Sequence, residues 1–363
     1  MKTSKILALA AFSLLTAQSN AQQTKILTAD KHNEYGLVYT LPTTNLEIEV
    51  TAKRTVNVAG PFYQYAKKFI GTDKVIKEDS ESWVITGVKV RPYGVADNSE
   101  QYLMQLKQGA LTSICVDENG MLLAINKEVS GNNGGSESTL STGPSGIDNI
   151  NINEYLQYVD EDFIASQSSA KKAQMLAESL MEIRDAKISL TRGTAETMPT
   201  DGKQLELMLN SLSHQEQVLT GAFLGVSESE TVSRTFTFTP TGDGRTVLFR
   251  MSDFAGFVGA DDYSGDPVYI TVKTTRKGEL PKDAKGEEKK LPKDAVIYNI
   301  PGAAEIAVTS SGKTFYEKEL EIAQFGVKFG LAPTLFSAKK ERSFAEFNPV
   351  TGGLKEIGEY GGE

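Results

Sequence analysis

Two stretches of sequence decide the fold: residues 168–193, SSAKKAQMLAESLMEIRDAKISLTRG, and residues 201–225, DGKQLELMLNSLSHQEQVLTGAFLG. In both, apolar side chains recur at spacings of three and four, which predicts one face of an amphipathic α-helix. The apolar positions of the first stretch are Ala173, Leu176, Ala177, Leu180, Ile183 and Ala186. Those of the second stretch are Leu205, Met208, Leu209, Leu212, Leu219 and Phe223. The sequence therefore predicts two helices, each roughly 33–38 Å long.

Both predicted helices carry start and stop signals. Ser168 or Ser169 can cap the first helix, and Asp201 supplies a side-chain acceptor for the first free amides of the second. Gly193 and Gly225 follow the last periodic residues, where a glycine commonly ends a helix. The segment between the helices contains a proline and cannot continue either one. We therefore expect an antiparallel helix pair.

One face of this helix pair needs to be covered. The opposite faces are charged or polar, so they suit water. On the second helix, four leucines form the apolar face: Leu205, Leu209, Leu212 and Leu219. These residues are the predicted partner surface if the rest of the chain leaves them bare.

The segments that flank the helix pair are typical of β-strands. Leu46, Ile48 and Val50 alternate with polar residues, as do Phe236 and Phe238. We therefore expect a β-rich α+β fold with two β-sandwich-like lobes, one on each side of the central helix pair. The predicted division is a signal peptide at 1–21, an N-terminal lobe at 22–126 with a short helix at 61–70, a flexible linker at 127–150, the helix pair at 151–225 and a C-terminal lobe at 226–363.

Two pairs of similar short segments, here called sequence echoes, suggest that the lobes are related. Tyr39-Thr40-Leu41-Pro42 and Tyr298-Asn299-Ile300-Pro301 each precede an alternating strand pattern. Further on, Gly87-Val88-Lys89-Val90 resembles Gly326-Val327-Lys328-Phe329. The alternative is that such short matches arise by chance in a β-rich chain.

The N-terminus has the composition of a cleaved secretory signal peptide. Lys2 and Lys5 precede an apolar run, and Ser19 and Ala21 place small residues where signal peptidase reads. The run of about 12 residues is too short to span a membrane core of about 30 Å. No cysteine lies near the cleavage site for a lipid anchor, and no later apolar run predicts a transmembrane segment. We therefore expect an exported protein, periplasmic or associated with the outer membrane.

The composition argues against nucleic-acid binding and excludes an intrachain disulfide. The formal net charge is −9, and phosphate contacts require clustered Lys and Arg, so general nucleic-acid binding is not expected. The lone Cys115 excludes an intrachain disulfide and is interpreted as a small residue on a strand. Stability must therefore come from packed cores.

No catalytic or metal-binding motif is present. His32 and His214 have no second histidine or cysteine at ligand spacing, so neither a metal nor a cofactor is predicted. The run around Asp261, Asp262 and Asp266 lacks the spacing of a helix-loop-helix calcium site and is interpreted as a polar turn. Many carboxylates are available for glycoside hydrolysis, but no spacing selects a pair.

Five short segments of the sequence resemble a known family. They are YGLVYTLP at 35–42, GPFYQYA at 60–66, VKVRP at 88–92, IAQFG at 322–326 and FNPVTGGLK at 347–355. The chain resembles an uncharacterised family of exported proteins from Bacteroides-type bacteria. That resemblance implies export and host class, and it implies no activity or site residue.

The combined reading is a non-catalytic binding or scaffolding component of the cell envelope with a protein partner. The alternatives are a carboxylate-based carbohydrate hydrolase, which requires a deep cleft with facing Asp or Glu side chains, and a glycan-binding module, which requires an exposed aromatic platform. Tyr63, Tyr65 and Tyr93 are the aromatic candidates for such a platform.

Overall fold

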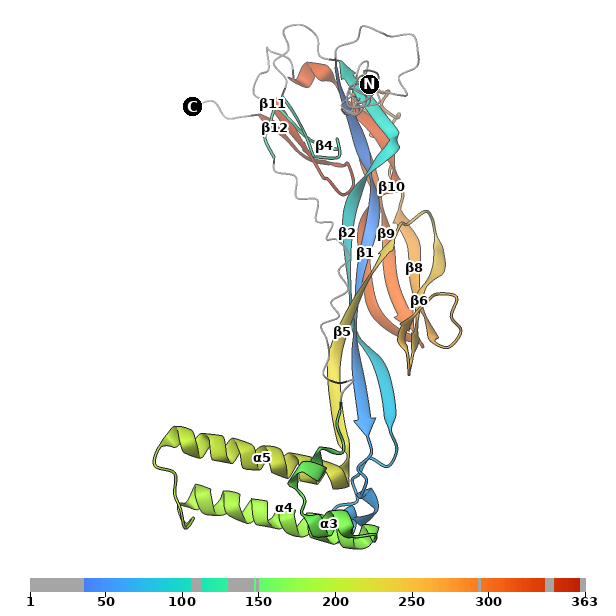
Figure 1. Ribbon diagram of the computed structural model, residues 1–363. Helices are drawn as coiled ribbons and strands as arrows, with labels where there is room; N and C mark the ends of the chain where they lie inside the picture. The colour runs from blue at the N-terminus through green and yellow to red at the C-terminus, as the bar shows by residue number, and fades with distance from the viewer. Residues whose placement is uncertain are drawn as a thin grey trace, which may run out of the picture.

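The molecule is long, with three β-sheets along its body and two long helices projecting sideways from one end (Figure 1). This computed structural model describes residues 36–105, 113–129, 147, 150–292, 295–336 and 343–359. The predicted signal peptide and most of the predicted linker lie outside these residues. Strands make up most of the regular structure and the sheets are antiparallel, so the expected β-rich α+β fold is confirmed.

A three-stranded sheet, here called the long sheet, runs down the molecule in the order β2-β1-β5. Its strands are β1 (Gly36–Val58), β2 (Ser80–Gln105) and β5 (Val226–Phe238). The alternation predicted for Leu46, Ile48 and Val50 is confirmed, because all three side chains are fully buried on one face of β1. A register shift between Thr40 and Pro42 marks where a proline, which has no amide hydrogen, enters the strand.

A five-stranded sheet packs against that buried face in the order β10-β9-β8-β6-β7. Its strands are β6 (Gly244–Ser252), β7 (Gly256–Val258), β8 (Asp266–Arg276), β9 (Val296–Ser310) and β10 (Lys313–Leu331). Ile270 and Ile306 from this sheet join the long sheet's apolar side chains in one core, where Phe236 and Phe249 stack at 4.4 Å between ring centroids. The two sheets therefore form a sandwich.

A four-stranded sheet lies beside the other end of the body, in the order β12-β11-β4-β3. Its strands are β3 (Ile114–Val116), β4 (Leu122–Ile125), β11 (Ser343–Phe347) and β12 (Leu354–Glu359), and the short helix η4 (Pro333–Phe336) precedes β11. The predicted turn at Asn119-Gly120 joins β3 to β4, with Gly120 at φ 79°. Cys115 is half-buried on β3, where its thiol donates to the Val129 carbonyl at 3.2 Å, as expected for a structural residue.

The strands on the two sides of the helix pair share sheets. β5 follows the helices but pairs with β1 along thirteen residue pairs from Leu46↔Phe238 to Val58↔Val226. β11 likewise pairs with β4, from the opposite end of the chain. Strands from the two flanking segments therefore share two of the sheets. Whether residues 22–126 and 226–363 fold independently stays a prediction, and this pairing argues against it.

The first sequence echo marks a structural repeat. Tyr39 and Tyr298 pack in the same core, and each is followed by a residue whose amide donates to a glycine carbonyl in a turn. Thr40 N donates to Gly120 O at 2.9 Å, and Asn299 N donates to Gly352 O at 3.0 Å. In both halves a long pair of strands, β1–β2 or β9–β10, is followed by a short pair, β3–β4 or β11–β12. These two units meet where β4 pairs with β11.

The second echo is not part of this repeat. Phe329 lies opposite Tyr298, and the equivalent position opposite Tyr39 is Tyr102. Val90 lies instead opposite Ile48, several residues further along the strand. The resemblance of 87–90 to 326–329 therefore comes from strand composition alone.

Candidate functional site

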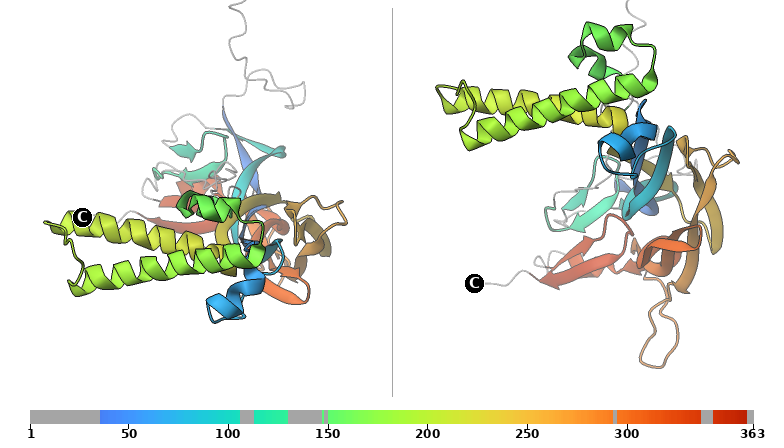
Figure 2. Two further views of the ribbon diagram at one scale, coloured as in Figure 1. Left: turned by 60° about the horizontal axis from the view of Figure 1, so that its bottom comes forward. Right: turned by 90° about the horizontal axis from the view of Figure 1, so that it is seen from below.

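The two predicted helices form α4 (Ser169–Arg192) and α5 (Gly202–Leu224), close to their predicted bounds. Ser168 caps α4, and the Asp201 carboxylate accepts from the amide of Gln204 at 2.8 Å at the start of α5. Gly193 ends α4 at φ 71°, in the left-handed region that glycine tolerates. The helices lie side by side and extend away from the strands (Figure 2).

The base of the helix pair is a packed core. Phe62, Tyr155 and Phe163 fill it together with the first half of α4 and the last turns of α5. These aromatic residues come from short elements: the turn before η1 (Tyr63–Tyr65) and α2 (Ala66–Phe69), η3 (Glu154–Tyr158) and α3 (Glu161–Ala165). The predicted helix at 61–70 is thus a 3₁₀ turn followed by one α-helical turn. This core fixes the helix pair to the end of the long sheet.

The predicted partner surface divides between this base and the distal half of the pair. Leu219 is fully buried in the base core, so it is architectural and unavailable to a partner, which corrects that part of the prediction. Leu205, Leu209 and Leu212 are half-buried. Every buried residue of α5 lies between 219 and 223, and α4 has only Leu190 buried beyond Leu180. The distal half of the pair is therefore thinly covered.

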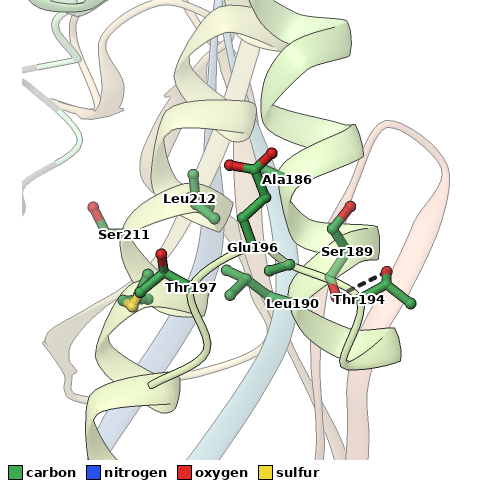
Figure 3. Close-up of a pocket in the computed structure, with 10 residues that line it drawn as sticks. Ala186, Ser189, Leu190, Thr194, Glu196, Thr197, Ser211 and Leu212 are labelled. Carbon is green, nitrogen blue, oxygen red and sulfur yellow. Dashed lines mark hydrogen bonds between the residues drawn. The ribbon is translucent and has the colours of Figure 1, made fainter. Parts of the chain in front are cut away.

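A pocket of about 580 Å³ opens between the helices in this distal half. Its lining comes from both helices and from the loop that joins them: Ala186, Ser189, Leu190, Thr194, Ala195, Glu196, Thr197, Met208, Ser211 and Leu212. Figure 3 shows Leu190 and Leu212 between the helices and Glu196 reaching back from the loop. The loop is held to α4 where Thr194 N donates to the Ser189 carbonyl at 2.9 Å.

The pocket has an apolar floor and a polar rim. Leu190 is buried and Leu212 is half-buried. The rim carries the hydroxyl oxygens of Ser189, Ser211 and Thr194 and the carboxylate of Glu196. Such a site can hold apolar side chains while hydrogen bonds around the edge fix their orientation. Leu212 belonged to the predicted surface, but the contribution of α4 and of the loop was missed, because it depends on how the helices pair.

Ion pairs join α4 to α5 between the pocket and the base. Glu216 on α5 accepts from Lys187 at 2.7 Å and from Arg184 at 2.8 Å, both on α4. The hydrogen bond from Lys187, then that from Arg184, lowers the pKa of the Glu216 carboxyl below its ordinary value. A second pocket, of about 450 Å³, adjoins this cluster and contains Glu216 as its single carboxylate. The first pocket likewise contains one carboxylate, so neither has the facing pair that a glycoside hydrolase needs.

The other sequence candidates lie apart. His214 is exposed on α5 with its Nε2 2.8 Å from a Glu154 carboxylate oxygen, as fits a surface residue. Tyr63 and Tyr65 lie by the helix base, whereas Tyr93 pairs with Asn45 much further along the long sheet, so they do not form one platform. Among the described residues no cluster of His, Cys, Asp or Glu can hold a metal ion.

The run from Gly259 to Asp266 forms a surface turn in which Asp262 accepts from the amide of Ser264 at 2.9 Å. Tyr263 in this turn is 85% exposed, and Phe254 on the turn between β6 and β7 is 76% exposed. One ring face of Tyr263 lies over the Arg250 guanidinium at 4.5 Å. Sequence reasoning missed these two aromatics, because exposure of a lone ring has no sequence pattern.

No described helix combines the length and the apolar character needed to cross a membrane. No curated protein and no solved structure matches the chain. Residues 35–355 match the family described as a domain of unknown function, DUF4831. Because that match covers most of its length, the chain belongs to the DUF4831 family.

Proposed function

We propose that this protein is an exported, non-catalytic binding or scaffolding component of the envelope of a Bacteroides-type cell. Its helix pair holds a partner protein in the pocket between the distal halves of α4 and α5. The observation that carries this proposal is the pocket's position: an apolar-floored site between the distal halves of α4 and α5 and the loop that joins them. These two helices project sideways from the body (Figure 1).

The shape of the site favours a helical partner. Two packed helices present a groove between them, and a third helix can lay its apolar ridge there. The volume of about 580 Å³ lies within the range of about 300–1,000 Å³ typical of ligand sites. The occupant is therefore a partner helix that inserts one or two apolar side chains over Leu190 and Leu212.

The distal half of the pair also needs such a partner for stability. Two helices alone bury little apolar surface, and helices gain most of their stability from tertiary packing. Met208, which lines the pocket, is 38% exposed, and Met198 in the joining loop is 40% exposed. Methionine is flexible and polarisable, and it is common at surfaces that accept apolar partners.

The test places a photo-crosslinking residue at Ser211, on the pocket rim, and at Asn210, which is exposed on α5 and does not line the pocket. A single envelope protein should be recovered reproducibly from position 211 and not from position 210. In the same cells, Ala186→Trp should fill the pocket and abolish the product, whereas Asn210→Trp should not. The proposal would be contradicted if the same protein were recovered equally from positions 210 and 211. It would also be contradicted if Ala186→Trp left the amount of crosslinked product unchanged.

Export is tested separately. If residues 1–21 are a cleaved signal peptide, the mature protein begins at Gln22 and deletion of the leader retains the protein in the cytoplasm. N-terminal sequencing and cell fractionation measure both. A mature protein that keeps Met1 would contradict the export assignment without affecting the binding proposal.

Glycan binding is the second candidate, favoured by Tyr263. Its free ring face can stack on a sugar ring, and neighbouring Asp261 and Asp262 offer acceptors for sugar hydroxyls. Binding to isolated envelope polysaccharide that is lost on Tyr263→Ala, with Phe254→Ala as the comparison, would establish it. Identical binding by Tyr263→Ala and the parent protein would remove it.

A further inference from the structure

Glu196 is the one charged side chain among the described residues that line the pocket between α4 and α5. The other lining side chains are small, hydroxyl-bearing or apolar. Figure 3 shows Glu196 extending from the joining loop toward the space between the helices. The loop is anchored two residues earlier, where Thr194 N donates to the Ser189 carbonyl at 2.9 Å. The carboxylate is therefore held beside an apolar floor.

Within the described part of the chain, this carboxylate has no hydrogen-bond or ion-pair partner. The two cations on α4 closest to the pocket are already engaged, because Lys187 and Arg184 donate to Glu216 at 2.7 Å and 2.8 Å. A carboxylate hydrogen-bonded to a cation is more strongly stabilised than one paired with a neutral donor. Glu196 is therefore available to a cation from outside the chain.

Six other charged residues surround the pocket without lining it. They lie on the distal halves of the two helices or in the loop, and all are exposed: Glu182, Asp185, Arg192, Asp201, Lys203 and Glu206. Acidic residues outnumber basic ones in this set, so the surroundings add to the negative charge of Glu196. A surface of this sign attracts a positively charged partner segment and repels an acidic one.

We propose that the partner helix carries a lysine or arginine beside its apolar side chains, and that Glu196 binds this basic residue. The inference rests on the proposed function, because it concerns the same pocket. Side chains three or four residues apart lie on one face of a helix. One apolar residue can therefore cover Leu190 and Leu212 while a basic residue one turn away reaches Glu196.

This pairing also fixes the direction of the partner helix. Glu196 belongs to the loop, so the basic residue must lie toward the distal end of the pocket. Reversal of the partner would carry that residue toward the base, where Arg184 and Lys187 are positively charged and would repel it. The apolar floor therefore holds the partner, and Glu196 is a specificity-determining residue that selects its sequence and orientation.

The test measures the amount of crosslinked product formed in cells from position 211 when Glu196 is changed. Glu196→Gln should lower it about threefold, since an exposed ion pair is partly screened, and Glu196→Lys about tenfold, since attraction becomes repulsion. Glu196→Asp keeps the charge and should retain more product than Glu196→Gln. Glu206→Gln is the matched control, because it removes an exposed carboxylate of α5 that does not line the pocket.

A charge exchange then tests the partner's side of the contact. Mass spectrometry of the product locates the crosslinked segment of the partner, which should contain a lysine or arginine one turn from an apolar residue. Replacement of that basic residue by glutamate should lower the product formed with the parent protein. The same replacement should restore the product formed with Glu196→Lys.

A parent product at position 211 that is unchanged by Glu196→Gln and Glu196→Lys would overturn this inference and leave the proposed pocket standing. A crosslinked segment without lysine or arginine, or a charge exchange that restores nothing, would do the same. Equal losses with Glu206→Gln and Glu196→Gln would show a general effect of charge and also overturn it. The absence of any product from the parent at position 211 would remove both proposals. Glu196 is exposed in a loop, and circular dichroism of each variant should match the parent.

Discussion

Replacement of Leu219 by Ala tests whether the base of the helix pair is the element that fixes it to the body. Leu219 is 0% exposed and packs in a core with Phe62, Phe163 and Leu180. A Leu→Ala change at such a site removes transfer free energy and leaves a cavity, at a cost of about 2–5 kcal/mol. The surrounding aromatic rings and the two long helices limit how far the site can collapse, so we expect Leu219→Ala to lower the free energy of unfolding by about 3 kcal/mol.

Two matched variants set the scale. Leu212→Ala removes a half-buried side chain at the pocket and should cost about 1 kcal/mol, because less apolar area leaves water. Leu207→Ala removes a side chain that is 63% exposed and should change the free energy of unfolding by no more than about 0.5 kcal/mol. The expected order of destabilisation is therefore Leu219, Leu212, Leu207.

Urea unfolding provides the assay, with two probes. Circular dichroism at the helix band reports on α4 and α5, and fluorescence of Trp83, the single tryptophan, reports on the long sheet. If the helix pair can open alone, Leu219→Ala should lower the helix midpoint more than the Trp83 midpoint. Equal costs for Leu219→Ala and Leu207→Ala would refute the assignment of Leu219 to a packed core.

Three further substitutions probe the β body. Glu346→Gln should destabilise the four-stranded sheet by about 1–2 kcal/mol, since its carboxylate accepts from Lys127 and Lys355. The hydrogen bonds from Lys127, then Lys355, lower the pKa of Glu346, so this stabilisation is present above its ordinary value of 4.5 and lost as pH falls through the folded value. Urea midpoints of parent and variant should therefore converge in acid, and a constant gap would contradict this. Asn299→Leu should cost about 1–3 kcal/mol for each of the two buried carbonyls that lose the Asn299 donor, measured by thermal unfolding, with the exposed Asn210→Leu as control. Gly256→Ala should destabilise by more than 1 kcal/mol, because Gly256 has φ 66° and an added Cβ would lie 2.8 Å from the Trp83 ring; Gly120→Ala, at a similar φ with open space, separates backbone strain from the clash.

Local features of this fold were predictable from sequence, and the pairing of distant strands was not. The helix bounds followed from Ser168, Gly193, Asp201 and Gly225, because caps and stops act within one turn. The pairing of β1 with β5 joins residues about 180 positions apart, and no local pattern encodes it. The expectation of one lobe on each side of the helices rested on chain order, and the pairing of β1 with β5 and of β4 with β11 argues against it.

The candidate site shows the same limit. The periodicity of α5 correctly placed Leu205, Leu209 and Leu212 on an apolar face, but it gave Leu219 the same weight. What separates Leu219 from the others is its cover of aromatic residues from short, irregular elements near 62, 155 and 163. The short helix predicted at 61–70 gave no indication of which leucines it covers, and the short elements near 155 and 163 were not predicted, so only the structure divides the apolar face into a buried base and a thinly covered distal half.

The helix pair lies outside the structural repeat. The unit β1–β4 and the unit β9–β12 repeat the same order of strands and share the turn contacts of Thr40 and Asn299. Their short strands pair edge to edge through β4 and β11, which leaves each unit incomplete without the other. The segment from η3 to β8, which contains the helix pair, joins them and has no counterpart within either unit. Within that segment β5 pairs with β1 and β8 pairs with β9, whereas α4 and α5 do not belong to any sheet. The helix pair is therefore where the molecule can acquire a binding surface without disturbing its body.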